Sequence, residues 1–132
     1  MSIFGSFTVG RELSDEERRW NRMWDLWVEG GVESPYAELM EYDSEVNNGG
    51  HSQYFFNVAN CGDLKTAVET ILPALPELLS ENLRKGYEAF ALQEDICDDV
   101  NDELFEECDN VFYSNEQLLI DVLKVYAENL CL

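Results

Sequence analysis

The sequence predicts an all-α protein that forms a single compact domain of about six or seven helices over residues 1–132. The chain is 45% apolar and contains seven Phe, six Tyr and three Trp, which is ample for a core and atypical of a disordered acidic chain. Apolar residues recur at helical spacing along most of the chain, and alternation is confined to Ile3–Val9. Residues 1–13 are therefore expected to form an arm, extended in part, before the helices.

Capping residues, glycines and prolines set the expected helix boundaries. Ser14 and Glu17 have the spacing of a capping box and predict a first helix that ends near Glu29. Ser34 followed by Pro35 predicts the start of a second helix, which runs to about residue 47. Further helices are expected over about 51–59, 63–72, 76–92, 94–110 and 115–130.

The first helix carries an aromatic stripe, since Trp20, Met23, Trp24 and Trp27 share one face. Such a stripe is usually part of a core, and we favour that interpretation. The alternative is an oligomer interface, where Trp and Met are enriched.

The chain carries a large excess of negative charge. The net charge is −20, and the first 22 residues are balanced, so the excess lies in residues 23–132. Such a surface repels nucleic acid and anionic membranes and attracts basic proteins, above all those that bind nucleic acid. We therefore expect no direct binding of nucleic acid, no membrane association, and a basic nucleic-acid-binding protein as the partner.

The acids are densest within a stretch, between Lys85 and Lys124, that has no basic residue. On a helix over 94–107, eight acids cover an arc of roughly 220° and fall about one per 2.6 Å of axis, against one charge per 1.7 Å in duplex DNA. Apolar residues and two cysteines, Cys97 and Cys108, fill the remaining arc. The candidate partner-binding residues are Glu94, Asp95, Asp98, Asp99, Asp102, Glu103, Glu106, Glu107 and Asp109.

Two interpretations of this acidic face stay open. One is a solvated face that keeps the protein soluble, and the other is a surface that imitates DNA. Either way, like charges one helical turn apart should oppose folding at low salt.

The sequence gives no sign of a metal, a cofactor or a known catalytic motif. The four cysteines, at 61, 97, 108 and 131, lack ligand-like spacing, and we interpret them as buried free thiols in a reducing compartment. There is one histidine, His51, and the nearest match to a calcium loop, from Asp99, lacks the required Gly and Glu. The missing catalytic motifs predict a non-enzymatic protein. No signal peptide or membrane span is recognisable, which predicts a cytoplasmic one.

A second informative segment is Glu45-Val46-Asn47-Asn48-Gly49-Gly50-His51-Ser52-Gln53-Tyr54-Phe55-Phe56-Asn57. It predicts a helix end that turns sharply into another helix, because Asn48, Gly49 and Gly50 tolerate positive φ. Gln53 and Asn57 are spaced to hydrogen-bond the exposed backbone of the turn. We favour a structural role for this motif; an active site around Glu45 and His51 is the alternative. The structural residues are Glu45, Asn47, Asn48, Gly49, Gly50, Gln53, Tyr54 and Asn57.

This segment resembles the signature of a bacterial DNA-mimic protein family, which reads roughly E-V-x-N-G-G-x-x-Q-Y-F-x-N. The resemblance extends over about residues 35–130, and later positions such as Asp109 and Phe112 also fit. It implies an all-α domain without established catalysis. For the member after which the family is named, the resemblance implies a dimer. The acidic surface of that dimer imitates duplex DNA and occupies a helix-turn-helix transcription factor.

The leading functional hypothesis is therefore a non-enzymatic DNA mimic that binds the nucleic-acid site of a basic DNA-binding protein, such as a helix-turn-helix transcription regulator. The alternative is an immunity or antitoxin protein that neutralises a nuclease toxin with the same electrostatics. A carboxylate–metal enzyme is the least favoured hypothesis.

Overall fold

The computed structural model describes residues 12–93 and 101–131. These residues form helices and no strand, which confirms the all-α class. The helices, five in the described part of the chain, are α1 (Asp15–Glu29), α2 (Tyr36–Cys61), α3 (Leu64–Ile71), α4 (Glu77–Ala91) and α5 (Asp102–Glu128). The expected number of six or seven was wrong, because two expected boundaries do not separate helices. Residues 1–11 of the expected arm and the expected helix start at 94 lie outside the described residues.

The first helix begins and ends as the sequence predicts. The Ser14 hydroxyl accepts a hydrogen bond from the Glu17 N–H at 3.1 Å, and the Glu17 carboxylate accepts one from the Ser14 N–H at 2.9 Å. Gly30 ends the helix in the left-handed region, at φ 80°. Both ends are thus fixed by local hydrogen bonding.

The second helix is longer than expected, because α2 continues through a sharp kink. Gly49 and Gly50 have non-helical backbone angles, and the helix then resumes and runs to Cys61. The expected turn is therefore present within one element. The expected Ser34 cap was wrong: the Ser34 hydroxyl donates to the Glu38 carboxylate, and the N-cap position is held by Pro35.

The third and fourth helices follow the predicted boundaries. The Asp63 carboxylate caps α3 by accepting from the Thr66 N–H at 3.1 Å. Pro76 precedes α4, and the hydroxyl of Ser80 in its first turn donates to the Leu72 carbonyl at 2.8 Å. The two helices are therefore joined by a short, hydrogen-bonded connection.

The last helix, α5, passes without interruption through residues 110–115, where we expected a break. This stretch contains Asn, Ser, β-branched and aromatic residues, which are weak helix formers. Tertiary contacts override that weakness, since Phe112 is fully buried and the Tyr113 hydroxyl donates to the Val46 carbonyl of α2 at 2.8 Å. The separate helices expected over 94–110 and 115–130 are thus one element in the part described.

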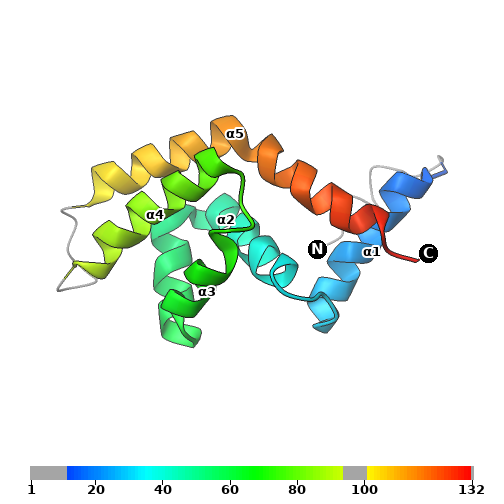
Figure 1. Ribbon diagram of the computed structural model, residues 1–132, viewed down its shortest axis with the longest axis horizontal. Coiled ribbons are helices and arrows are strands. Elements are labelled where there is room, and N and C mark those ends of the chain that lie inside the picture. Colours follow the sequence, from blue (N-terminus) through cyan, green and yellow to red (C-terminus); the bar gives the residue numbers. More distant parts are fainter. Residues whose placement is uncertain (1–11, 94–100, 132) are drawn as a thin grey trace.

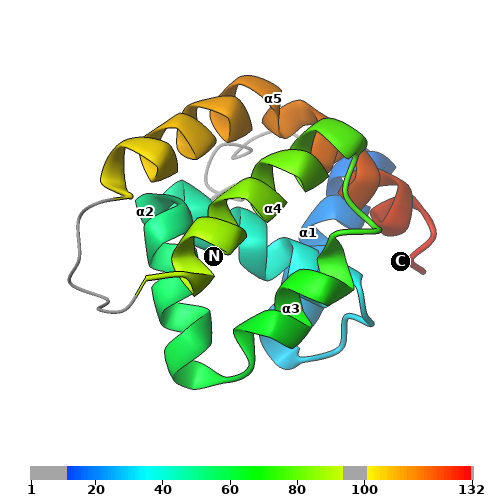
Figure 2. The ribbon, with the colours of Figure 1, turned by 60° about the vertical axis from the view of Figure 1, so that its left-hand side comes forward.

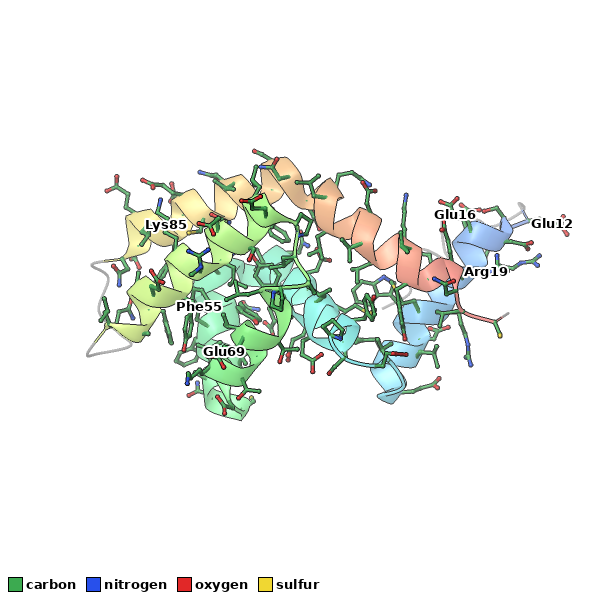
Figure 3. All side chains as sticks on the ribbon, in the orientation of Figure 1. Glu12, Glu16, Arg19, Phe55, Glu69 and Lys85 are labelled. Atoms are coloured by element: carbon green, nitrogen blue, oxygen red, sulfur yellow. The ribbon has the colours of Figure 1, made fainter. Side chains whose placement is uncertain are left out.

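The long α5 spans the molecule and packs mainly against α1, α2 and α4 (Figure 1). Its first half lies against α4, its middle against α2, and its end against α1. At that end the Arg19 Nε donates to the Leu130 carbonyl at 3.2 Å, and Lys124 lies 3.9 Å from Glu16, a residue labelled with Arg19 in Figure 3. Phe55 of α2 packs between the rings of Phe90 and Phe105, which joins α2, α4 and α5 in one core.

The aromatic stripe of α1 packs against that core, as favoured from the sequence. Met23 is fully buried, and the three tryptophans are half-buried. Trp24 packs edge-to-face on Trp20 and Trp27, and the Trp27 indole N–H donates to the Ala37 carbonyl at 3.0 Å. A half-buried stripe still leaves part of its aromatic surface in contact with solvent.

Candidate partner-binding surface

The first turns of α5 display the predicted division between acidic and apolar residues. Asp102, Glu103, Glu106 and Glu107 are exposed, whereas Phe105 and Cys108 are buried. We call these four exposed residues the α5 acidic face. They fall within about 9 Å of helix axis, or about one charge per 2.3 Å, which is close to the charge density of duplex DNA. The other predicted acids (Glu94, Asp95, Asp98 and Asp99) lie outside the described residues.

A lysine from the neighbouring helix reaches the α5 acidic face. Lys85 Nζ of α4 lies 3.9 Å from Glu107 Oε1, and both side chains are exposed. Figure 3 shows Lys85 on α4, beside the first turns of α5. The sequence has no base within the acidic stretch, so this ion pair depends on the packing of α4 against α5. It leaves Asp102, Glu103 and Glu106 as the acids of this face without an ion pair in the described structure.

Asp109, the last predicted partner-binding residue, is turned toward the protein. Its Oδ1 accepts hydrogen bonds from the His51 N–H and from the His51 ring Nδ1, each at 2.7 Å. Only 23% of its side chain is exposed. Asp109 therefore caps the second part of α2, which begins at His51 directly after the kink. The helical pattern contained the signal for this, because Asp109 falls between Phe105 and Phe112 on the buried stripe of α5.

The kink in α2 places different demands on its two glycines. Gly50 has φ 82°, and a Cβ at this residue would lie 2.4 Å from Oδ2 of Asp109. Gly49 has φ −157°, an extended value, and needs to be small because a Cβ there would meet the side chain of Gln53. Asn48 is exposed, and no residue other than glycine has positive φ in the described part of the chain. Of the three residues that tolerate positive φ, only Gly50 adopts it at this kink.

The polar residues of the motif bond to each other across the kink. Oε1 of Glu45 accepts from Gln53 Nε2 at 2.8 Å and from Asn57 Nδ2 at 3.0 Å. The expected hydrogen bonds to exposed backbone are therefore replaced by a bridge from the first part of α2 to the second. Asn47 Nδ2 donates to the Asp43 carbonyl and to Oε2 of Glu116, both at 2.8 Å, which links the same region to α5.

His51 belongs to this internal network. Its side chain is fully buried, its Nδ1 faces Asp109, and its Nε2 lies 2.7 Å from the Tyr42 hydroxyl. Burial raises the pKa of Tyr42 well above its ordinary value. The chain of contacts from Asp109 through His51 to Tyr42 holds α5 against both parts of α2, and it is closed to solvent at the histidine.

A buried acid, Asp43, lies between α2 and α5. Asp43 is 6% exposed and faces Glu116. Burial, and then the hydrogen bond to Glu116 and its charge, raise the pKa of Asp43 to about 8. Asp43 is therefore protonated at neutral pH, because a buried carboxylate beside another negative charge is unfavourable. The sequence signal was again the helical spacing, which places Asp43 with Leu39 and Val46 on the buried face.

The described residues show neither a metal-binding cluster nor a membrane-spanning helix. They contain no group of three or more His, Cys, Asp or Glu side chains arranged to hold a metal ion. Cys108 is buried and unpaired, as expected, whereas the unpaired Cys61 and Cys131 are exposed. Cys97 lies outside the described residues. No helix in the described ranges combines the length and the apolar character needed to cross a membrane.

Comparison with protein families identifies the chain. The model of the family described as DMP19-like protein, named after DNA mimic protein 19, matches residues 35–130. The chain belongs to the DMP19-like family. Among curated proteins and solved structures, no significant match was found. The matched region contains α2 to α5, including the kink and the α5 acidic face, and leaves α1 outside.

Proposed function

We propose that this protein is a non-enzymatic DNA mimic, which binds the nucleic-acid site of a basic DNA-binding protein such as a helix-turn-helix regulator. The observation that carries the proposal is membership of the DMP19-like family in a chain of net charge −20. The exposed carboxylates of the α5 acidic face supply the chemistry. They stand in for phosphates and accept charge-assisted hydrogen bonds from Lys and Arg side chains of the partner.

This mechanism depends mainly on negative charge at the protein surface. Cations gather on a row of carboxylates as they do on DNA, and pairing with Lys and Arg of the partner releases them. Binding should therefore weaken steeply with salt, and DNA should compete. Presentation of the carboxylates on a rigid helix favours binding, because side chains on a packed helix lose less conformational freedom on binding than side chains on a loop.

We also propose that the protein forms a homodimer through the outer side of α5. Val111, Leu118 and Val125 are exposed by 37%, 40% and 61%, and they follow one another at intervals of seven residues. This spacing aligns them as an apolar stripe along one side of the helix, which a second copy of the chain would cover. Leu118→Glu should convert the dimer into a monomer, as measured by size-exclusion chromatography with light scattering. A wild-type protein that is monomeric at all concentrations would contradict this arrangement.

The experiment that tests the mimic begins with capture of the partner from lysate of the source cell, elution by salt and identification by mass spectrometry. The partner is then titrated at several salt concentrations with the wild type and with Asp102→Asn/Glu103→Gln/Glu106→Gln. We expect the variant to bind more weakly. Its log–log salt slope should be shallower by about one for each carboxylate that no longer pairs with a basic side chain of the partner.

A matched control removes the same number of charges elsewhere. Asp25→Asn/Glu29→Gln/Glu33→Gln changes three exposed acids outside the matched region and gives the same net charge. We expect this control to bind nearly as well as the wild type. Equal binding and an equal salt slope for both variants, or a complex that DNA does not displace, would rule out mimicry by this face.

A further inference from the structure

A lysine of α4 reaches the α5 acidic face across the contact between the two helices. The first half of α5 lies beside α4 in both ribbon views (Figures 1 and 2). Lys85 Nζ lies 3.9 Å from Glu107 Oε1. Among the ion pairs of the described residues, this is the one that links the α5 acidic face to another helix. Lys85 therefore neutralises part of the surface that carries the candidate binding residues.

Buried contacts between α4 and α5 set the position of this lysine. Asn82, one turn before Lys85, is 8% exposed. Its Nδ2 donates to the Cys108 carbonyl at 2.9 Å, and Cys108 Sγ donates to the Asn82 carbonyl at 3.7 Å. A Cβ at Gly86 would lie 3.4 Å from Cys108 Sγ, so the two helices approach closely beside Lys85. These contacts place Lys85 opposite Glu107, the residue before Cys108.

The ammonium group of Lys85 has a second carboxylate within its own helix. Its side chain is 60% exposed, so it can change its conformation without disturbing the core. Glu88 lies one turn further along α4, is exposed, and makes no ion pair in the described structure. Glu81, on the previous turn, is already paired with Arg84. Lys85 and Glu88 line the same hollow, of about 320 Å³, so Lys85 can leave Glu107 and remain beside a carboxylate.

We propose that Lys85 is an autoinhibitory counter-ion of the α5 acidic face. It occupies Glu107 in the free protein and must be displaced before a base of the partner can pair with that carboxylate. The role of Lys85 in the complex rests on the mimic function proposed above, whereas its competition with an added base does not. The other three acids of the face have no such competitor among the described residues.

The competition lowers affinity without blocking binding. An exposed ion pair is weak, so Lys85 holds Glu107 only part of the time, and we expect its loss to strengthen binding by about twofold. When a base of the partner takes Glu107, the displaced ammonium group stays on α4 near Glu88. No buried charge is left without a partner, and the exchange needs no change of backbone.

The contact also has a signature in the salt dependence of binding. A carboxylate that is not paired attracts cations from the solution, and these are released when a base of the partner binds. While Lys85 occupies Glu107, this carboxylate attracts fewer salt cations, and binding there releases Lys85 instead. Loss of Lys85 should therefore make the salt dependence steeper, and its effect on affinity should be greatest at low salt.

The first experiment uses hexalysine, acetylated and amidated at its ends, as a simple basic ligand. It is titrated into the isotope-labelled full chain at several salt concentrations, and binding is followed by NMR through the backbone amides of residues 102–108. We expect Lys85→Met to bind hexalysine about twofold more tightly than the wild type at low salt, with a log–log salt slope steeper by up to about one. Met removes the charge and keeps an unbranched side chain.

Lys65→Met is the matched control for the change in net charge. Lys65 Nζ lies 3.8 Å from Glu69 of its own helix, α3, and its side chain is 72% exposed. Figure 3 shows Glu69 on α3, away from Lys85. The control loses the same charge and a similar ion pair, so we expect its affinity and salt slope at residues 102–108 to stay close to those of the wild type.

Two further variants assign the effect to the contact with Glu107. Lys85→Arg keeps the net charge and can hold the carboxylate by two parallel hydrogen bonds, so it should weaken hexalysine binding by about twofold. In a Glu107→Gln background, Lys85→Met should have no more effect than Lys65→Met. Equal strengthening by Lys85→Met and Lys65→Met would overturn the proposal. So would binding by Lys85→Arg as tight as by Lys85→Met, or an effect of Lys85→Met that survives Glu107→Gln.

The second experiment measures affinity for the captured partner, which Lys85→Met should bind about twofold more tightly than Lys65→Met does. If hexalysine responds as expected but the partner binds both variants equally, Lys85 does not restrain the complex and the mimic function stands. If the triple substitution at Asp102, Glu103 and Glu106 also leaves the partner unaffected, the mimic function fails. The hexalysine titration still decides the competition at Glu107.

Discussion

Asp109 of α5 holds His51 of α2 by two hydrogen bonds to one carboxylate oxygen, Oδ1, which lies 2.7 Å from both the backbone nitrogen and the ring Nδ1. The contact fastens the longest helix to the residue at which α2 resumes after its kink. It also removes Asp109 from the acids that can face a partner. The acidic residues of α5 are thus divided between surface charge and internal support.

We expect Asp109→Ala to lower the free energy of unfolding by about 2–3 kcal/mol, because it leaves a buried N–H and a buried imidazole without an acceptor. Urea denaturation monitored by circular dichroism measures the change. Asp102→Ala serves as the control, since Asp102 is an exposed acid of the same helix and should change stability by less than about 0.5 kcal/mol. Equal effects of the two substitutions would contradict the structural role of Asp109.

Comparison with Gly30 tests whether Gly50 is needed for more than its left-handed backbone conformation. Both have positive φ, but a Cβ at Gly30 meets nothing within 4 Å, whereas a Cβ at Gly50 meets Asp109. We expect Gly30→Ala to cost about 1 kcal/mol from backbone strain alone, and Gly50→Ala to cost about 3 kcal/mol or more because the Asp109 carboxylate is displaced as well. Thermal melts of the two variants make the comparison.

The double variant Gly50→Ala/Asp109→Ala tests the origin of the extra cost. If the clash is the cause, the two substitutions are less than additive, because neither residue then obstructs the other. Strict additivity, or equal costs at Gly30 and Gly50, would assign the whole effect of Gly50→Ala to backbone strain.

Local patterns in the sequence were sufficient for most helix boundaries. The capping box at Ser14, the Asp63 cap and the glycine kink depend on residues within one or two turns of each other, so sequence spacing reports them. The continuity of α5 could not be predicted in this way. It depends on burial of Phe112 and on the Tyr113 hydrogen bond to α2, which are contacts between distant segments.

The same distinction applies to the candidate surface. Exposure of Asp102, Glu103 and Glu106 follows from helical periodicity and was predicted. The Lys85–Glu107 ion pair was missed because it requires knowledge of which face of α4 meets α5. The absence of a partner for the buried Tyr54 hydroxyl was missed for the same reason, since an aromatic residue in a buried stripe does not reveal what its polar end faces.

The α5 acidic face should make stability depend on salt. Asp102 and Glu106, and likewise Glu103 and Glu107, lie one turn apart, and such like-charge pairs oppose folding by about 0.2–0.5 kcal/mol each. We expect the melting temperature to rise between low and near-molar NaCl, because screening weakens this repulsion and that of the whole anionic surface. The variant Asp102→Asn/Glu106→Gln should start higher and rise less. A flat or falling melting temperature in the wild type would contradict electrostatic strain.

Asp43 should make stability depend on pH in a predictable direction. Its folded-state pKa is raised to about 8 by burial and by Glu116, whereas an unfolded Asp titrates near pH 3.9. Between these values the folded chain holds a proton that the unfolded chain has released, so the contribution of Asp43 to stability is present at low pH and is lost as the pH rises toward 8. Asp43→Asn keeps a hydrogen-bond donor toward Glu116 without titrating.

The difference in unfolding free energy between Asp43→Asn and the wild type isolates this group from other carboxylates. We expect the variant to match or trail the wild type at pH 5 and to exceed it by about 1–3 kcal/mol at pH 9, as measured by urea denaturation at each pH. Glu116→Gln removes the neighbouring negative charge that helps to raise the pKa of Asp43. The pH-dependent loss of stability should therefore be smaller in Glu116→Gln and should end at a lower pH than in the wild type. Parallel stability curves for the wild type and Asp43→Asn would mean that Asp43 is ionised in the folded protein at neutral pH.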